Sequence, residues 1–379
     1  MYNEFVNFVK TLYPNNIPVP LHAPVFMGKE KEYLLDCIDS TFVSYVGKYV
    51  TQFEEMTARF TGAKYAVAVV NGTAALQIAL QIAGVGYDDE VITQPVTFVA
   101  TANAISHCGA KPVFVDVDLD TMGMSPESLD DFLKANCEMK KGFCLNKITC
   151  KYIKAIVPMH TFGFPCRIEE IIEIASKYNI PVIEDAAESL GSYYKDKHTG
   201  TFGLAGILSY NGNKTITTGG GGIIITDDEE FAKKAKHRTT TAKLPHRYEY
   251  VHDEVAYNYR LTNLNAAIGV AQMENLNKFL ENKRDTSTKY QNFFKGGKTK
   301  YFNEPLNTKA NYWLNVIILN NIEARNEFLE YTNDNGVMTR PIWRLMNKLV
   351  MYKDCQSGKL DNALWFEERV ANIPSGVRA

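Results

Sequence analysis

The chain has 379 residues, of which 45% are hydrophobic and 22% charged, and this balance excludes a disordered or fibrous protein. Its length predicts one large domain with a smaller second domain rather than a small binding module. Lysine and arginine number 41 against 43 aspartate and glutamate, a net charge of -2, so no broad surface is marked for nucleic acid or an anionic membrane.

Residues 1–24 form a predicted N-terminal segment. They lack the basic patch and apolar run of a signal peptide, and no window of the chain approaches the length of a membrane span. We therefore expect a cytoplasmic enzyme. The seven cysteines form no C-x-x-C pair, which argues against a disulfide framework or a structural zinc site.

The pattern of residues 25–245 indicates a large α/β domain. Residues 64–70 predict a buried strand, Asn71 and Gly72 a turn, and 73–83 a helix. The same alternation continues with strands at 91–93, 112–115, 153–157 and 181–183 and a helix at 98–107. It predicts a mainly parallel sheet with helices on both faces.

Polar residues follow several of these strands. In open parallel sheets ligands bind beyond the carboxyl ends of the strands, so these residues are the first candidates for chemistry. They are Asn71, Thr97, His160 and Asp185.

Residues 137–151 carry charges with little periodicity and predict an irregular excursion before the next strand. Cys137, Cys144 and Cys150 lie in this stretch, at spacings that do not match zinc ligands. We therefore expect free thiols and no metal.

Residues 246–379 predict a smaller C-terminal α/β domain. In it, residues 262–280 form an expected long helix and 313–319 an isolated strand.

Asp185 and Lys214 are the candidate catalytic pair. A buried carboxylate at a strand end can keep a pyridinium nitrogen protonated, as pyridoxal 5′-phosphate (PLP) requires, although such a residue is also often a metal ligand or a helix cap. Lys214 follows 29 residues later, before four consecutive glycines at 219–222 that permit close backbone approach and positive φ. A lysine amine with a lowered pKa forms an imine with an aldehyde, whereas a solvated loop lysine is the plain alternative.

A phosphate site is indicated at Gly72 and Thr73, because the start of a helix offers free N–H groups and a hydroxyl. Ser209 supplies a second hydroxyl. Asn213 rather than glycine precedes Lys214, so there is no Walker A loop, and no G-x-G-x-x-G motif follows a strand. This weakens the ATPase and dehydrogenase interpretations.

Together these residues resemble a known family, the DegT/DnrJ/StrS-type sugar-nucleotide aminotransferases, which are PLP enzymes of fold type I. The resemblance covers nearly the whole chain. Its motifs are residues 71–76 (NGTAAL), 97–101 (TFVAT), 112–117 (PVFVDV), 184–188 (EDAAE), 209–214 (SYNGNK), 257–262 (YNYRLT) and 266–269 (AAIG).

The resemblance implies a role for each matching position. Lys214 is the implied Schiff-base lysine, Asp185 the partner of the pyridine nitrogen, and Phe98 the residue that stacks on the ring. Gly72, Thr73 and Ser209 hold the phosphate, and Asn258 completes the phosphate site of the neighbouring subunit, which implies a homodimer with shared active sites. Glu188 departs from the glutamine or histidine usual near the ring hydroxyl and the substrate, and so indicates a subgroup.

Within the family, residues 209–219, 311–315 and 339–343 are most similar to the legionaminic-acid (LegC-type) branch. That branch transfers the amine of glutamate to C4 of a nucleotide-linked 2-acetamido-2,6-dideoxy-4-keto hexose, in the biosynthesis of bacterial amino sugars such as legionaminic acid or bacillosamine. Trp313, Arg340 and Trp343 suit a sugar that carries an anionic diphosphate, although the tryptophans are equally typical of core. His160 and Glu188 are further candidates for substrate binding, and His160 is also consistent with a structural role.

Three other functions remain open from the sequence. A sugar 3-aminotransferase would share all of these residues. A PLP-dependent sugar dehydratase would have histidine where Lys214 stands, and a non-enzymatic ligand-binding module would not need the intact set of Asp185, Ser209 and Lys214.

Overall fold

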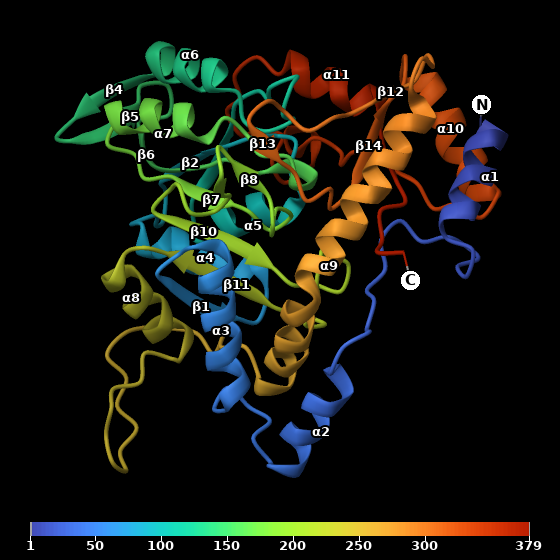
Figure 1. Ribbon diagram of the computed structural model, residues 1–379. Coiled ribbons are helices and arrows are strands. Elements are labelled where there is room, and N and C mark those ends of the chain that lie inside the picture. The colour runs from blue at the N-terminus through green and yellow to red at the C-terminus, as the bar shows by residue number, and fades with distance from the viewer. Residues whose placement is uncertain (1, 379) are drawn as a thin grey trace.

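The computed structural model describes residues 2–378. Its large domain is built on two hydrogen-bonded strand groups, ordered β3-β2-β6-β5-β4 and β1-β11-β10-β7. Parallel bridges between residues 156 and 182 and between 159 and 185 join β6 to β7, so the two groups form one continuous layer (Figure 1). Its principal strands are β1 (Tyr65–Val69), β2 (Glu90–Thr93), β3 (Lys111–Phe114), β6 (Lys151–Val157), β7 (Ile183–Asp185), β10 (Ala205–Ser209) and β11 (Gly222–Thr226). Of these, β11 alone runs in the opposite direction to the others, which confirms the predicted mainly parallel sheet.

Alternating strand residues divide the core of this domain between the two faces of the sheet, as the pleat requires. Val67 and Ile224 pack on one face with helices α4 (Gly72–Ile82) and α8 (Glu229–Thr239). Ala68 and Ile225 pack on the other face with α3 (Lys48–Thr61) and α9 (Asn263–Phe294). The covering helices are α3 (Lys48–Thr61), α4 (Gly72–Ile82), α5 (Val99–His107), α6 (Pro126–Asn136), α7 (Ile168–Lys177) and α8 (Glu229–Thr239).

The stretch expected to be an irregular excursion is a regular hairpin, β4 (Cys137–Lys140) and β5 (Phe143–Asn146), and β5 pairs with the first part of β6. Lys141 and Gly142 both have positive φ, 52° and 83°, as the two central residues of a type I′ turn require. Lysine is an unusual first residue for a type I′ turn, so the sequence alone did not indicate a hairpin. Cys137 and Cys144 are buried free thiols, and Cys150 is an exposed one.

The C-terminal part forms an antiparallel sheet, ordered β12-β14-β16-β15. Its elements are β12 (Lys300–Tyr301), β14 (Asn315–Ile318), α10 (Ile322–Asp334), β15 (Arg340–Pro341), the 3-10 turn η2 (Met346–Lys348), α11 (Asp361–Arg369) and β16 (Val370–Ile373). The first helix, α1 (Tyr2–Leu12), packs on α10, where the rings of Tyr2 and Phe328 lie 5.6 Å apart (Figure 1). Shorter elements are α2 (Glu30–Asp39), the 3-10 turn η1 (Thr161–Gly163), β8 (Tyr193–Tyr194), β9 (Lys197–His198) and β13 (Thr308–Lys309).

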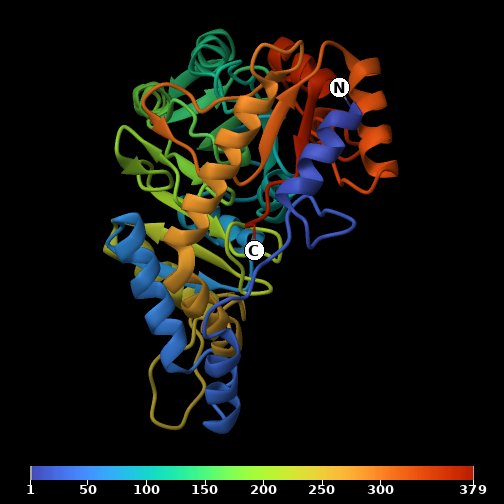
Figure 2. The ribbon, with the colours of Figure 1, turned by 45° about the vertical axis from the view of Figure 1, so that its right-hand side comes forward.

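One long helix, α9 (Asn263–Phe294), runs from the large sheet into the C-terminal part (Figure 2). The expected helix ended at residue 280. Residues 281–295 contain neither glycine nor proline, so no helix-stopping residue follows until Gly296. Thr262 caps its start by accepting a hydrogen bond from the backbone of Asn265. Within residues 2–378, no helix combines the length and apolar character needed to cross a membrane.

Candidate active site

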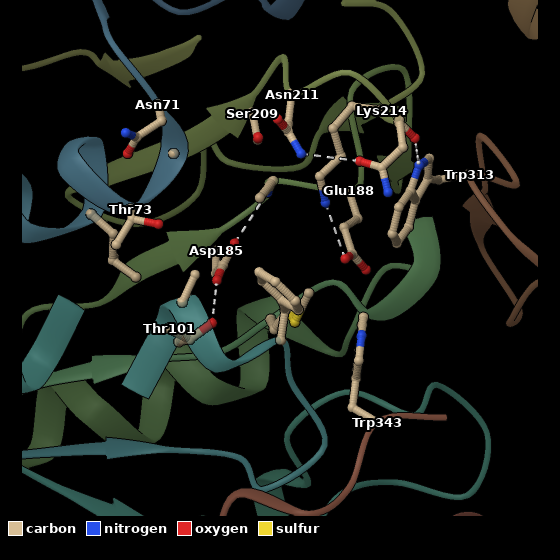
Figure 3. A pocket seen from close by; sticks show the side chains of 17 residues that line it. Asn71, Thr73, Thr101, Asp185, Glu188, Ser209, Asn211, Lys214, Trp313 and Trp343 are labelled. Atoms are coloured by element: carbon tan, nitrogen blue, oxygen red, sulfur yellow. Dashed lines mark hydrogen bonds and ion pairs between the residues drawn. The ribbon is translucent and has the colours of Figure 1, made fainter. Parts of the chain in front are cut away.

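A cavity of about 320 Å³ lies where β7 and β10 end and where α4 and α5 begin (Figure 3). It is lined by Asn71, Gly72, Thr73, Leu76, Phe98, Ala100, Thr101, Met159, Asp185, Ala187, Glu188, Ser209, Asn211, Asn213, Lys214, Trp313 and Trp343. Ten of the fourteen residues proposed from the sequence are in this lining, including Asp185 and Lys214.

Asp185 is the last residue of β7 and is 5% exposed. One carboxylate oxygen accepts a hydrogen bond from the Thr101 hydroxyl at 2.7 Å, and the other accepts the N–H of Ala187 at 3.2 Å. Thr101 in turn contacts the hydroxyl of Thr97 at 2.7 Å. These bonds fix the rotamer of an anionic side chain that lines the cavity, as pairing with a cationic ring nitrogen requires.

The start of α4 forms a phosphate-sized cradle. The side chain of Asn71 caps the helix by accepting the N–H of Ala74 at 2.8 Å. The amides of Gly72 and Thr73 have no intrahelical acceptor, because they are the first two of the helix. A Cβ on Gly72 would lie 3.1 Å from that of Ser209, so glycine keeps this corner open. Free amides at a helix start beside two hydroxyls suit a phosphate.

The glycine run acts on this cradle indirectly. A Cβ on Gly222 would come within 2.4 Å of the Asn71 backbone, so glycine there lets β11 pack against the turn into α4. Gly219 has a φ of 81°, and none of the four glycines lines the cavity. The close approach of Gly222 is therefore to the chain that forms the phosphate cradle.

Lys214 extends into the cavity opposite Asp185 (Figure 3). Its amine donates to one oxygen of Glu188 at 3.1 Å and lies 4.0 Å from the centre of the Trp313 ring. The other oxygen of Glu188 accepts the N–H of Phe162 at 2.9 Å. Burial raises the pKa of Glu188 to about 7, although Lys214 opposes this change. A buried carboxyl that titrates near neutral pH thus lies within hydrogen-bonding reach of the amine.

Aromatic rings form one wall of the cavity. Trp343 lies 4.6 Å from Phe162 and 6.3 Å from Phe98, measured between ring centres. Phe98, at the start of α5, remains 49% exposed, so one face is available to a planar ligand. Trp313 is nearly buried, and its indole N–H donates to the carbonyl of Asn213 at 2.7 Å.

Four predicted site residues do not line this cavity, and one of them, Thr97, lies behind Thr101. His160 is fully buried, and its ring contacts Glu184 at 2.9 Å and accepts the N–H of Cys166 at 3.2 Å, which gives it a structural environment. Arg340 is exposed and donates to Asn333 at 2.9 Å. Asn258 is exposed on the segment beside α8, bridged to Thr240.

Residues that the sequence did not single out complete the site. Thr101 orients Asp185, and Asn211 and Asn213 form the loop before Lys214. Asn311 was noted only within a motif, yet its side chain donates to the carbonyls of Glu188 and Leu190 at 2.8 and 2.9 Å. A polar side chain within a local motif was the available signal, but its partners lie more than 120 positions away.

This arrangement fits PLP. The carboxylate of Asp185 suits the ring nitrogen, the cradle of Gly72, Thr73 and Ser209 suits the phosphate, and the amine of Lys214 suits the aldehyde. All three groups line one cavity, as a single ligand requires. In the described chain, no cluster of three or more histidine, cysteine, aspartate or glutamate residues suits a metal ion.

Comparison with known proteins gives a consistent picture. Residues 26–378 match the DegT/DnrJ/EryC1/StrS aminotransferase family. The chain is 38% identical over 336 residues to the GDP-perosamine synthase of Escherichia coli O157:H7, covering 89% of this chain and 87% of that one. It is 35% identical over 362 residues to the GDP-perosamine synthase of Vibrio cholerae, with 94% of each chain covered. Helicobacter pylori PseC, an aminotransferase involved in the biosynthesis of pseudoaminic acid, has the same fold, with a TM-score of 0.85 at 23% identity over 94% of this chain and 93% of that one.

Proposed function

The chain belongs to the DegT/DnrJ/EryC1/StrS aminotransferase family, and we propose that it moves the amino group of glutamate to the C4 ketone of a nucleotide-linked 2-acetamido-2,6-dideoxy-4-keto hexose. It is a PLP-dependent aminotransferase of fold type I, as the sequence predicted. The observation that carries the proposal is the meeting of Asp185, Lys214 and the phosphate cradle in one cavity.

Each residue has a defined task in this proposal. PLP, when bound, would supply an aldehyde that can take up an amino group and a pyridinium ring that acts as an electron sink. Asp185 keeps the ring nitrogen protonated, and the start of α4 with Ser209 binds the phosphate. Lys214 attaches the cofactor and, once released, carries a proton between the cofactor and the substrate carbon.

The aromatic wall suits both the cofactor and the sugar. In this proposal Phe98 stacks on the cofactor ring, and Trp343 offers an apolar ring face to the sugar. The two relatives named as GDP-perosamine synthases support a substrate joined to a nucleotide. The choice of C4 and of a 2-acetamido sugar depends on the motifs shared with the legionaminic-acid branch, at residues 209–219, 311–315 and 339–343.

A homodimer with shared sites is part of the proposal. Residues 241–256 and α2 project from the same end of the molecule in both views (Figures 1 and 2). Both carry exposed apolar side chains, among them Ile38, 59% exposed, and Tyr250, 79% exposed. Exposed apolar surface of this kind favours association with another chain. Asn258, at the base of the projecting segment, is then positioned to reach the phosphate site of the partner.

The test is a substrate panel. The purified enzyme is incubated with PLP, glutamate and 4-keto and 3-keto sugars on UDP, GDP and dTDP, with products identified by mass and NMR. We expect one nucleotide-linked 4-keto sugar to gain an amine at C4, and none to react with the Lys214→Ala variant. An amine at C3 would refute the branch assignment, and reaction only with ketones that carry no nucleotide would refute the substrate class.

A further inference from the structure

Lys283 lies in the middle of α9 with its side chain fully buried. Its amine donates to the carbonyl of Ser375 at 2.6 Å and to that of Trp313 at 3.2 Å, and it contacts Nε2 of His22 at 2.9 Å. These partners among residues 2–378 are two carbonyls and an imidazole, with no carboxylate. Burial lowers the pKa of Lys283 to about 7. An amine without an anionic partner is an expensive group to bury, since an apolar side chain would fill the same space without that cost.

His22 completes this contact from the N-terminal side. Its segment is held in place, because Leu21 accepts the N–H of Ser375 at 2.7 Å and Val25 accepts the side-chain N–H of Gln272 at 3.0 Å. Burial and the two neighbouring cations, Lys283 and Lys214, lower the pKa of His22. The ring is therefore neutral at neutral pH and serves Lys283 as an acceptor.

The group that Lys283 holds is the backbone of Trp313, and Trp313 is fixed at two further points. Its N–H donates to the side chain of Asn311 at 2.8 Å, and its indole N–H donates to the carbonyl of Asn213, directly before Lys214. Tyr312 has a φ of 50°, a conformation that a bulky residue adopts only where its surroundings impose it. The chain at 311–313 is therefore set in place by contacts from several segments.

We propose that Lys283, assisted by His22, is a positioning residue that fixes Trp313 against Lys214. Removing its amine frees the carbonyl of Trp313, and the indole then loses its place 4.0 Å from the Lys214 amine. Trp313 also contacts the loop before Lys214 through Asn213. When the indole moves, the Lys214 side chain loses the ring that limits its rotamers. The functional part of this proposal rests on the proposed role of Lys214, whereas the placement of Trp313 does not.

The test compares Lys283→Met with Tyr290→Phe. Tyr290 is a matched control, because it is also buried on α9 and its hydroxyl donates to the carbonyl of Pro374, beside Ser375, at 2.8 Å. In cofactor-free protein with Trp343→Phe and Trp365→Phe, Trp313 is the remaining tryptophan, and its quenching by acrylamide reports its accessibility. We expect higher quenching in Lys283→Met and unchanged quenching in Tyr290→Phe.

Turnover is measured without those tryptophan substitutions. We expect Lys283→Met to lower kcat roughly tenfold with little change in KM, because small misplacements of a reacting group have effects of this order. Equal quenching and turnover for Lys283→Met and Tyr290→Phe would overturn the proposal, and so would an accessible Trp313 with wild-type turnover. A wild-type enzyme without activity on any ketone would instead refute the proposed function and leave the quenching result valid.

His22 provides a second route if Lys283→Met fails to fold. Leucine at this position removes the acceptor for the Lys283 amine, whereas glutamine retains one. We expect His22→Leu to raise the quenching of Trp313 and lower kcat, and His22→Gln to restore both toward wild type. Wild-type quenching and turnover in His22→Leu would overturn the assisting role of His22 and, with it, the proposal as stated.

Discussion

Replacing Glu188 with glutamine should remove a pH-dependent contribution to the stability of the cofactor-free protein. Glu188 is 1% exposed, and burial raises its pKa from 4.5 to about 7. Between these pH values the folded protein holds a proton that the unfolded chain has released. The stabilisation is therefore complete below about pH 4.5 and is lost as the pH rises through about 7. At about 1.36 kcal/mol per pKa unit, this loss amounts to roughly 3 kcal/mol.

Urea unfolding of both cofactor-free proteins, at matched pH values between about 5 and about 9, measures this loss. Other titrating groups are common to wild type and variant, so the difference between their free energies of unfolding isolates Glu188. We expect wild type to lose roughly 3 kcal/mol relative to Glu188→Gln across that range. Glu184→Gln is the control variant, because Glu184 is equally buried. Burial raises the pKa of Glu184, but His160 and backbone donors lower it by more, so that its pKa lies below the ordinary value. If the free energies of unfolding of wild type and Glu188→Gln changed in parallel with pH, Glu188 would not have a raised pKa in the folded protein.

Three other predictions concern the proposed chemistry. Lys214→Ala should abolish turnover, and borohydride treatment followed by mass measurement should find no cofactor attached; retention of both would show that another lysine serves. Asp185→Ala should bind PLP more weakly and slow turnover on the order of 10²- to 10³-fold, the usual cost of losing a fixed electrostatic partner; near-normal rates would mean that another group protonates the ring. Dilution to monomer should release cofactor if Asn258 acts across the interface as we propose, and a fully active monomer in analytical ultracentrifugation would contradict this.

The strands and the phosphate cradle were predictable because their signals are local. The buried run at 64–70 became β1, and the glycine and threonine that follow it became the first residues of α4. Apolar runs report burial, and a helix start offers the same free amides in any fold. Local signals failed at residues 137–151, where they did not distinguish an irregular excursion from a hairpin. The turn of that hairpin, Lys141-Gly142, begins with a residue that is unusual there.

His160 shows what position along a strand cannot determine. We expected residues just beyond strand ends to bind ligands, and His160 does lie just beyond such an end. Successive side chains of an extended chain, however, point to opposite faces of the sheet. Met159 consequently lines the cavity, and His160 faces away from it toward Glu184. Arg340 also does not line the cavity, since its side chain points outward to Asn333. Direction depends on register with neighbouring strands, which a single sequence does not reveal.

The buried residues that face away from the cavity at the end of β7 nevertheless support the site. Glu184 accepts N–H bonds from Gly200, Phe202 and Gly203 at 2.7 to 2.8 Å, in addition to its contact with His160. These bonds tie the end of β7 to the turn that leads into β10, the strand that carries Ser209. Because Asp185 is the next residue after Glu184, its backbone is fixed by contacts on the opposite face of the sheet from the cavity. The backbone of Asp185 is thus held from one face of the sheet, while Thr101 and Ala187 orient its carboxylate in the cavity on the other.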